Sequence, residues 1–306
     1  MTAAAARSTP LSRAATRGAR IGPDWRNGLF VVPFLLVYLG MLIYPLFWGM
    51  WISLQEYDMF DQSATYAGLV NFKRLFGDAI FLGTVRNTFV FVLMTVPAFV
   101  IIGLGLALAL NREGRTGATL RAVFFGASVL SVTIVTIIWK IMYLPDIGLL
   151  SHILGLFGIA PIPFLTSQSL ALPAVAVTTV WWIIGLPMML FLAALQQIPG
   201  ELYEAAALDN AGRWRSLRSI TLPSITRTFV VVVIYEIVAQ FQLFGQALLL
   251  TRGGPNNMSR SIVLFIYETG FRDWNLGYAA AASEVLFLLM AIAAMAQYIA
   301  SRRKEA

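Results

Sequence analysis

A carboxylate and an amide lie inside one long apolar stretch, residues 228–250, where polar groups are energetically expensive. Glu236 is followed by Ala239, Gln240 and Leu243, so these four residues stand at i, i+3, i+4 and i+7 and share one helical face. Ionisable side chains inside membrane-length segments are functional candidates by default. Carboxylate and amide groups with neighbouring aromatic rings can hydrogen-bond sugar hydroxyls and stack on C–H faces. Alternatively, Glu236 pairs with a basic residue or a backbone group between subunits.

A second candidate region is the loop at residues 196–227. Glu201 and Glu204 begin an alanine-rich segment without Pro or Gly up to Ala211, which predicts a helix. Gly212 then predicts a break, and Pro223 ends a second helix. Such a helical hook offers an apolar contact, ringed by charges, to a partner on the same side of the membrane. The alternative is an amphipathic helix that rests on lipid.

Residue types needed for other chemistry are scarce. The chain has no cysteine, which excludes disulfides and thiolate metal sites. His152 is the single histidine and is expected to be a surface residue. None of the three lysines follows a glycine, so the Gly-Lys-Ser/Thr phosphate loop of an ATPase is absent. Neither a Ser-His-Asp arrangement nor paired carboxylates share a segment. We therefore expect no enzymatic activity and no cofactor bound by this chain.

The elements that must position these residues are predicted to be transmembrane helices. Of 306 residues, 58% are apolar and 12% charged, about half the charged share of a soluble domain. The continuous apolar runs are too long for barrel strands, and helices of this length cross a bilayer core. This predicts an all-α integral membrane protein with six transmembrane helices. The predicted spans are residues 29–54, 88–110, 122–139, 170–195, 228–250 and 276–300.

Basic residues predict the orientation of these spans. The two tails and the second and fourth loops hold 15 of the 22 Lys and Arg residues, whereas the opposite side holds six. Both termini are therefore expected in the cytoplasm, and the net charge of +7 needs no nucleic acid partner. Residues 1–28 are predicted to form a disordered tail, 29–300 the transmembrane domain and 301–306 a short tail. The loop at 143–169 is expected to contain a short interfacial helix.

The loop at 196–227 resembles the EAA loop of importer-type ABC transporter permeases. Glu204-Ala205-Ala206, Ile220 and Leu222-Pro223 match its spacing, whereas Asn210 stands where the family has Gly. Asn takes a left-handed turn more readily than other non-Gly residues, so we expect the bend to be kept. In the family this loop couples to an ATPase subunit. The resemblance assigns that role to Glu204, Ala205, Ala206, Asp209, Asn210, Gly212 and Arg213.

Further motifs are similar to the carbohydrate permeases of the maltose and glycerol-phosphate type. These motifs are Tyr44-Pro45, residues 195–199, residues 250–255 and residues 277–281. The resemblance implies the type I importer permease fold in a bacterial or archaeal cytoplasmic membrane. It also implies a second homologous permease, two ATPase subunits that bind ATP and Mg²⁺, and an extracytoplasmic solute-binding protein.

The resemblance also implies a solute path. It places the stripe of Glu236, Ala239, Gln240 and Leu243 along that path, with Trp181, Trp182 and Leu186 on a second helix. Adjacent tryptophans point about 100° apart on a helix, so at most one of the two is expected to face the path squarely. Transport would proceed by alternating access. The alternative is an ion-coupled secondary transporter that uses Glu236 and Glu284 as relay groups.

Overall fold

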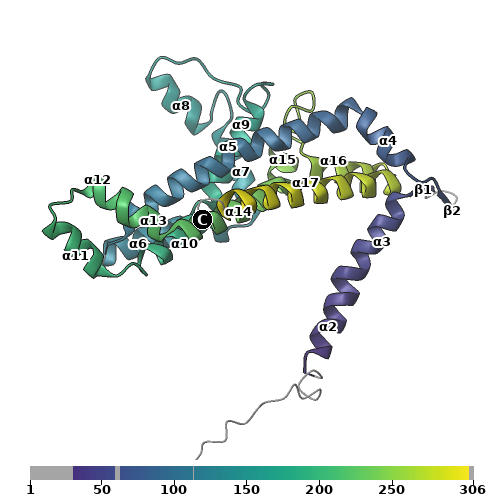
Figure 1. Ribbon diagram of the computed structural model, residues 1–306. Helices are drawn as coiled ribbons and strands as arrows, with labels where there is room; N and C mark the ends of the chain where they lie inside the picture. The colour runs from purple at the N-terminus through teal and green to yellow at the C-terminus, as the bar shows by residue number, and fades with distance from the viewer. Residues whose placement is uncertain (1–29, 59–62, 113, 303–306) are drawn as a thin grey trace, which may run out of the picture. The chain divides into compact units, whose positions relative to one another are not determined.

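The computed structural model describes residues 30–58, 63–112 and 114–302, and these are mainly helical (Figure 1). The predicted tail at 1–28 lies outside the described residues, as do residues 303–306. The chain divides into two units, residues 1–48 and 49–306, which are described separately.

In the first unit, α2 (Val32–Tyr38), a π-helical turn (Leu39–Ile43) and the start of α3 (Tyr44–Ser53) form one helical run. Pro33 stands in the first turn of α2, where its missing N–H costs nothing. The π-helical turn ends two residues before Pro45, and the Tyr44 backbone N–H donates to the Leu39 carbonyl. The run of 22 residues, Val32–Ser53, is long and apolar enough to cross a membrane, as predicted.

The second unit begins with the end of α3 and a small hairpin. Strands β1 (Gln55–Asp58) and β2 (Ser63–Tyr66) pair antiparallel with Gln55 opposite Tyr66, and α4 (Val70–Gly77) follows. The Asn71 amide donates to the carbonyls of Ser53 and Gln55 at 3.0 and 2.8 Å. These bonds satisfy one carbonyl at the end of α3 and one in β1.

Two long helices organise this unit. Helix α5 (Ala79–Leu110) begins where the Asp78 carboxylate accepts the Ile80 and Phe81 amides, and α17 (Leu276–Arg302) is the last described element. Helix α14 (Thr226–Phe241) packs against both of them (Figure 1). Helix α5 also packs against α9 (Ala171–Ile183) and α10 (Gly185–Leu195). The buried core is therefore shared by helices that lie far apart in the sequence.

Three pairs of consecutive helices meet at bends. Helices α6 (Arg115–Val129) and α7 (Val132–Met142) meet at 101°, α9 and α10 at 46°, and residues 213–224 meet α14 at 67°. The span predicted at 122–139 contains such a bend, because the chain turns at Leu130 and the Ser131 hydroxyl caps α7. Three helices of the described chain are long and apolar enough to cross a membrane, or up to six if each bent pair counts as one span.

The span predicted at 228–250 is also interrupted. Helix α14 ends at Phe241, and after a short break the chain continues as α15 (Gly245–Leu250). A loop then leads to α16 (Ile262–Tyr267) and a π-helical turn (Glu268–Arg272). Hydropathy does not register the break, because the apolar Leu243 and Phe244 in it keep the stretch hydrophobic.

The predicted short helix in the loop at 143–169 is confirmed as α8 (Leu149–Leu156). His152 is exposed there.

Candidate functional site

The first candidate site is the hook, which we define as residues 200–224. It consists of α11 (Gly200–Leu208), α12 (Arg213–Ser216), a π-helical turn (Leu217–Thr221) and α13 (Leu222–Ser224). Glu201 lies in the first turn of α11, where a negative charge favours the helix N-terminus. The predicted order of helix, Gly-containing break and second helix near Pro223 is confirmed.

Asn210 makes the turn between α11 and α12. Its φ of 52° is left-handed, as we expected for the residue at the family's Gly position. The backbone N–H of Asn210 donates to the Ala207 carbonyl at 3.1 Å, and the backbone N–H of Ala211 donates to the Ala206 carbonyl at 2.9 Å. This pair of bonds is the Schellman arrangement, which satisfies carbonyls that a helix end leaves free.

A side-chain contact holds the two arms of the hook together. The hydroxyls of Tyr203 and Thr221 lie 2.9 Å apart. Beside them lies a cavity of about 510 Å³ whose lining includes Leu108, Leu195 and Arg213. The sequence did not indicate the Tyr203–Thr221 contact, because it joins residues 18 positions apart across a turn.

The tip of the hook is open to solvent. Leu208 is 86% exposed and Trp214 is 72% exposed, which is unusual for large apolar side chains in one small element. Ala206 is partly buried; the other six residues that we expected to couple to a partner are also exposed: Glu204, Ala205, Asp209, Asn210, Gly212 and Arg213. The hook therefore presents apolar groups with charges around them, which is the composition of a protein contact surface.

The hook continues directly into α14 through a bend at Ile225. This residue is 1% exposed and packs in an apolar cluster with Met188, Phe191 and Val232. Its φ and ψ of −96° and 6° end α13 and begin α14. The hook is thus joined to the helix that carries Glu236 by one buried residue.

Glu236 and Gln240 form the centre of the second candidate site. The Gln240 Nε2 atom donates to Glu236 Oε2 at 2.9 Å, and the side chains are 0% and 4% exposed in this chain. The second carboxylate oxygen, Oε1, is buried and has no hydrogen-bond partner among the described residues. An unpaired carboxylate oxygen is energetically costly in an apolar surrounding, so a hydrogen-bond donor from a bound molecule or a neighbouring chain would stabilise it.

The other residues of the predicted path separate into two places. Leu243 is buried in an apolar cluster against which Trp182 packs, and Trp182 donates its indole N–H to the Leu130 carbonyl at 3.1 Å. Trp181 instead packs edge-on against Trp139 and lines an apolar hollow of about 480 Å³. The two tryptophans thus point to different surroundings, as the helical spacing predicted.

Ala239 on α14 is partly buried. Leu186, also partly buried, lies on α10 beyond the bend that follows Trp181 and Trp182. Around these positions and elsewhere in residues 30–58, 63–112 and 114–302, no three His, Asp or Glu side chains come together in a way that could hold a metal ion.

The loop at residues 251–261 connects the break in the predicted span 228–250 to α5. The sequence motif at 250–255 indicated only the beginning of this loop. The Asn87 amide on α5 donates to the carbonyls of Asn257 and Arg260 at 2.7 and 3.1 Å. The Ser261 hydroxyl donates to the Leu243 carbonyl at 2.5 Å, a group left free where α14 has ended. The loop thereby fixes the end of the helix that carries the Glu236 stripe.

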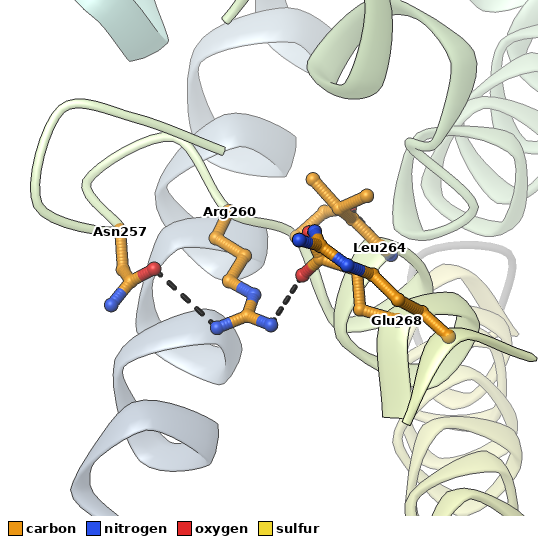
Figure 2. Close-up of polar contacts among 6 residues, drawn as sticks. Asn257, Arg260, Leu264 and Glu268 are labelled. Atoms are coloured by element: carbon orange, nitrogen blue, oxygen red, sulfur yellow. Dashed lines mark hydrogen bonds and ion pairs between the residues drawn. The ribbon is translucent and has the colours of Figure 1, made fainter. Parts of the chain in front are cut away.

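Arg260 stabilises the same loop through contacts with Glu268 and Asn257 (Figure 2). Its guanidinium pairs with the carboxylate of Glu268, at the start of the π-helical turn, and donates to Asn257 Oδ1 at 3.4 Å. Arg272 lies 3.9 Å from the other oxygen of Glu268. Neither Arg260 nor Glu268 was singled out from the sequence, because a pair eight residues apart on a loop and a helix has no periodic signal.

Comparison with known proteins identifies a matching family. Residues 80–305 match the family described as "Binding-protein-dependent transport system inner membrane component". A diacetylchitobiose uptake system permease protein, NgcF, of Streptomyces coelicolor is 32% identical over 90% of this chain and 79% of its own length. The trehalose/maltose transport system permease protein MalF of Thermococcus litoralis is 31% identical over 85% of this chain and 87% of its own length.

The fold is also found among solved structures. A chain of a bacterial alginate ABC transporter, solved with an alginate pentasaccharide-bound periplasmic protein, superposes with a TM-score of 0.80 at 23% identity. The match covers 92% of this chain and 95% of that one. This similarity supports the arrangement of the helices described above.

Proposed function

Because this chain belongs to the family of binding-protein-dependent transport system inner membrane components, we propose that it is the permease subunit of an ATP-driven importer for a sugar or sugar-like solute. The names of its relatives support the solute class, since they include uptake systems for diacetylchitobiose and for trehalose or maltose. The proposed solute is an oligosaccharide, a polyol or a glycerol conjugate.

The observation that carries this proposal is the hook. It is compact, closed by Asn210, and presents Leu208 and Trp214 to solvent. We propose that this surface seats on an ATPase subunit, with Glu204 and Arg213 as flanking contacts. ATP and Mg²⁺ are bound by two such ATPase subunits, and this chain binds neither. The further partners are a second, homologous permease and an extracytoplasmic solute-binding protein.

The proposed topology has six spans, with each bent helix pair counted as one and both termini in the cytoplasm. It follows the distribution of Lys and Arg, which are concentrated in the hook and the tails. The hairpin, α4 and the loop at 251–261 then lie at the opposite, extracytoplasmic end. This arrangement gives the hook access to cytosolic ATPases and gives the other end access to the binding protein.

The proposed mechanism is alternating access. Closure of the ATPase subunits moves the hook, the bend at Ile225 passes the movement to α14, and the surroundings of Glu236 and Gln240 change. The free Oε1 atom of Glu236 and the Gln240 amide offer the acceptor and donor groups that sugar hydroxyls need. The chain itself performs no covalent chemistry, and the energy of the cycle comes from hydrolysis on the partner subunits.

Affinity purification of the tagged chain in mild detergent, followed by mass spectrometry and an ATPase assay, tests the proposal. We expect a second permease and an ATPase to co-purify, and the ATPase rate to rise when a sugar-loaded binding protein is added. Glu204→Lys is expected to lower this stimulation by about tenfold, because it reverses a charge at a contact. Asp146→Lys, the same charge reversal at an exposed position outside the hook, is the matched control.

A preparation without an ATPase subunit, whose solute uptake collapses with an uncoupler while ATP remains, would overturn the proposal. That result would favour the ion-coupled transporter, with Glu236 and Glu284 as relay groups.

A further inference from the structure

A polar cavity of about 280 Å³ lies apart from both candidate sites. Three segments that are distant in the sequence enclose it: the junction of α4 and α5, the region from Arg260 to the π-helical turn, and the start of α17. Its lining differs from the apolar hollow beside Trp181, because most of the residues are polar. These are Arg74, Asp78, Arg260, Asp273, Asn275 and Tyr278, with Thr269 behind them.

One wall of this cavity is held by contacts within the chain. The Tyr278 hydroxyl donates to Asp78 Oδ2 at 2.9 Å, and Asp78 Oδ1 caps α5 by accepting the Ile80 amide at 2.8 Å. The guanidinium of Arg74 lies over the Tyr278 ring, 4.6 Å from its centroid. These contacts fix the polar groups of this wall before any molecule binds, which lowers the entropy cost of binding.

Arg260 also lines the cavity, and Figure 2 shows its contacts with Asn257 and Glu268. It is held by Glu268 and Asn257 and lies 5.4 Å from the centroid of the Phe265 ring. Its Nε atom is buried and has no hydrogen-bond partner in the described part of the chain. These contacts set the position of the guanidinium before any molecule binds.

Other groups around the cavity also have spare hydrogen-bonding capacity. Asn275 uses Oδ1 to accept the backbone amide of Tyr278 at 3.2 Å, and its NH₂ group has no partner among the described residues. Among the described residues, neither Arg74 nor Asp273 takes part in an ion pair. Several polar groups with unused donors or acceptors thus converge on one hollow, which is the pattern of a small-molecule site.

The chemistry of the lining points to the ligand. Two arginines and two aspartates give the lining no net formal charge, so it does not select an anion or a cation. A sugar hydroxyl both donates and accepts, and it suits a lining that offers guanidinium and amide donors beside carboxylate acceptors. The volume is near the lower limit for small-molecule pockets, which suits one ring rather than a whole oligosaccharide.

We propose that this cavity is an additional binding site for one pyranose ring of an uncharged sugar, separate from the Glu236 stripe. The proposal rests on the proposed function, because it takes the solute class and the extracytoplasmic position of this end from there. Phe265, in the cavity wall, belongs to the same apolar cluster as Phe241, the last residue of α14. The site therefore lies at the outer end of the helix that carries the stripe.

The absence of cysteine in the chain allows a local measurement. Ile80, which lines the cavity and is exposed, is replaced in the full chain by Ile80→Cys and labelled with a trifluoroethylthio group. The ¹⁹F shift is followed in lipid nanodiscs during titration with D-glucose, D-galactose, D-mannose and N-acetyl-D-glucosamine. Arg86→Cys, exposed on the same helix and outside the lining, carries the control label.

We expect a saturable shift with at least one of the four sugars at position 80 and none at position 86. Asp273→Asn and Arg74→Gln should each weaken this binding by about tenfold, the effect of losing one hydrogen bond to a charged group. Asp146→Asn, in another loop, should leave it within about twofold. Size-exclusion profiles and melting temperatures equal to those of the parent show that the variants are folded.

No saturable shift with any of the four sugars would overturn the proposal, and so would a shift that persists in both Asp273→Asn and Arg74→Gln. If these variants instead reduce the stimulation by a loaded binding protein while no sugar shifts the label, the cavity receives a side chain of that protein, and the sugar assignment is wrong. If a loaded binding protein stimulates the ATPase but no sugar changes the ¹⁹F shift, the cavity proposal is wrong and the proposed function stands. If a sugar changes the ¹⁹F shift but no ATPase activity is stimulated, the cavity site stands and the proposed transport function is wrong.

Discussion

The amide of Gln240 donates to the carboxylate of Glu236 at 2.9 Å, one helical turn away on the same buried face of α14. The contact uses one carboxylate oxygen and leaves the other without a partner in the described chain. The pair is therefore internally oriented and still able to accept one more hydrogen bond.

Removal of the amide should affect transport more than folding. Gln240→Ala takes away the group that orients the carboxylate, and it is expected to lower the uptake rate by about tenfold, since a hydrogen bond to a charged group is worth roughly 1.5–3 kcal/mol. Gln242→Ala, at an exposed position beyond the end of α14, is the control. Uptake of labelled solute in whole cells, corrected for protein amount in the membrane, measures both. Equal losses in the two variants would contradict a specific role for the Glu236–Gln240 pair.

We expect the hook to tolerate substitution of Gly212 and to lose coupling when Asn210 is replaced by a β-branched residue. Gly212 has φ −64° and open space where a Cβ would lie, so Gly212→Ala is expected to preserve stimulated ATPase. Asn210 has φ 52°, which a β-branched side chain disfavours by roughly 1–2 kcal/mol. Asn210→Val should lower coupling and Asn210→Gly should retain it. An ATPase assay of the assembled complex measures the coupling of each variant. A lower stimulated ATPase rate in Asn210→Gly would show that the Asn210 side chain contributes more than the left-handed conformation.

The tie between α5 and the loop at 251–261 should be visible in hydrogen exchange. Asn87→Ala leaves the carbonyls of Asn257 and Arg260 without their donor, and each unsatisfied buried group costs about 1–3 kcal/mol. Faster amide exchange is expected in residues 251–261, with a lower melting temperature. Asn111→Ala, at the exposed C-terminal end of α5, should change neither. Unchanged exchange in Asn87→Ala would mean that Ser261 and Arg260 hold the loop without it.

Two glycine substitutions should have opposite effects. A Cβ at Gly277 would collide with the Gln55 carbonyl and crowd the Asn71 amide, so Gly277→Ala should disturb the contact of α17 with the hairpin. Gly105 on α5 has no neighbouring atom within 4 Å of the position that a Cβ would take, and Gly105→Ala should be neutral or stabilise by about 0.5–1 kcal/mol. Melting temperatures in detergent compare the two variants. Equal melting temperatures would show that the hairpin moves away at no cost.

The sequence predicted the helical class and the hook, because both leave local signals. Apolar runs of membrane length indicated the spans, and the alanine-rich segment followed by Asn210 and Gly212 indicated a helix and its left-handed end. The bends between helices were harder to predict from the sequence. At Leu130 the hydropathy does not change, and the capping hydroxyl of Ser131 was the available sign of a new helix.

The contacts around the second site could not be read from one sequence. Asn87 and Asn257 are 170 positions apart, and nothing in the neighbours of either residue shows the pairing. The polar cavity likewise joins residues from three separate segments. Only the packing of α5, α16 and α17 brings these groups together.

In the proposed mechanism, the bend at Ile225 acts as the pivot of a lever. Ile225 is the fulcrum, the hook is the short arm, and α14 is the long arm, with Glu236 eleven residues further along the chain. At 1.5 Å per residue that arm is about 16 Å long, so a rotation of about 10° at the fulcrum would displace the carboxylate by roughly 3 Å, the length of one hydrogen bond. In the proposed mechanism, a small tilt of the hook is therefore sufficient to make or break a polar contact at Glu236.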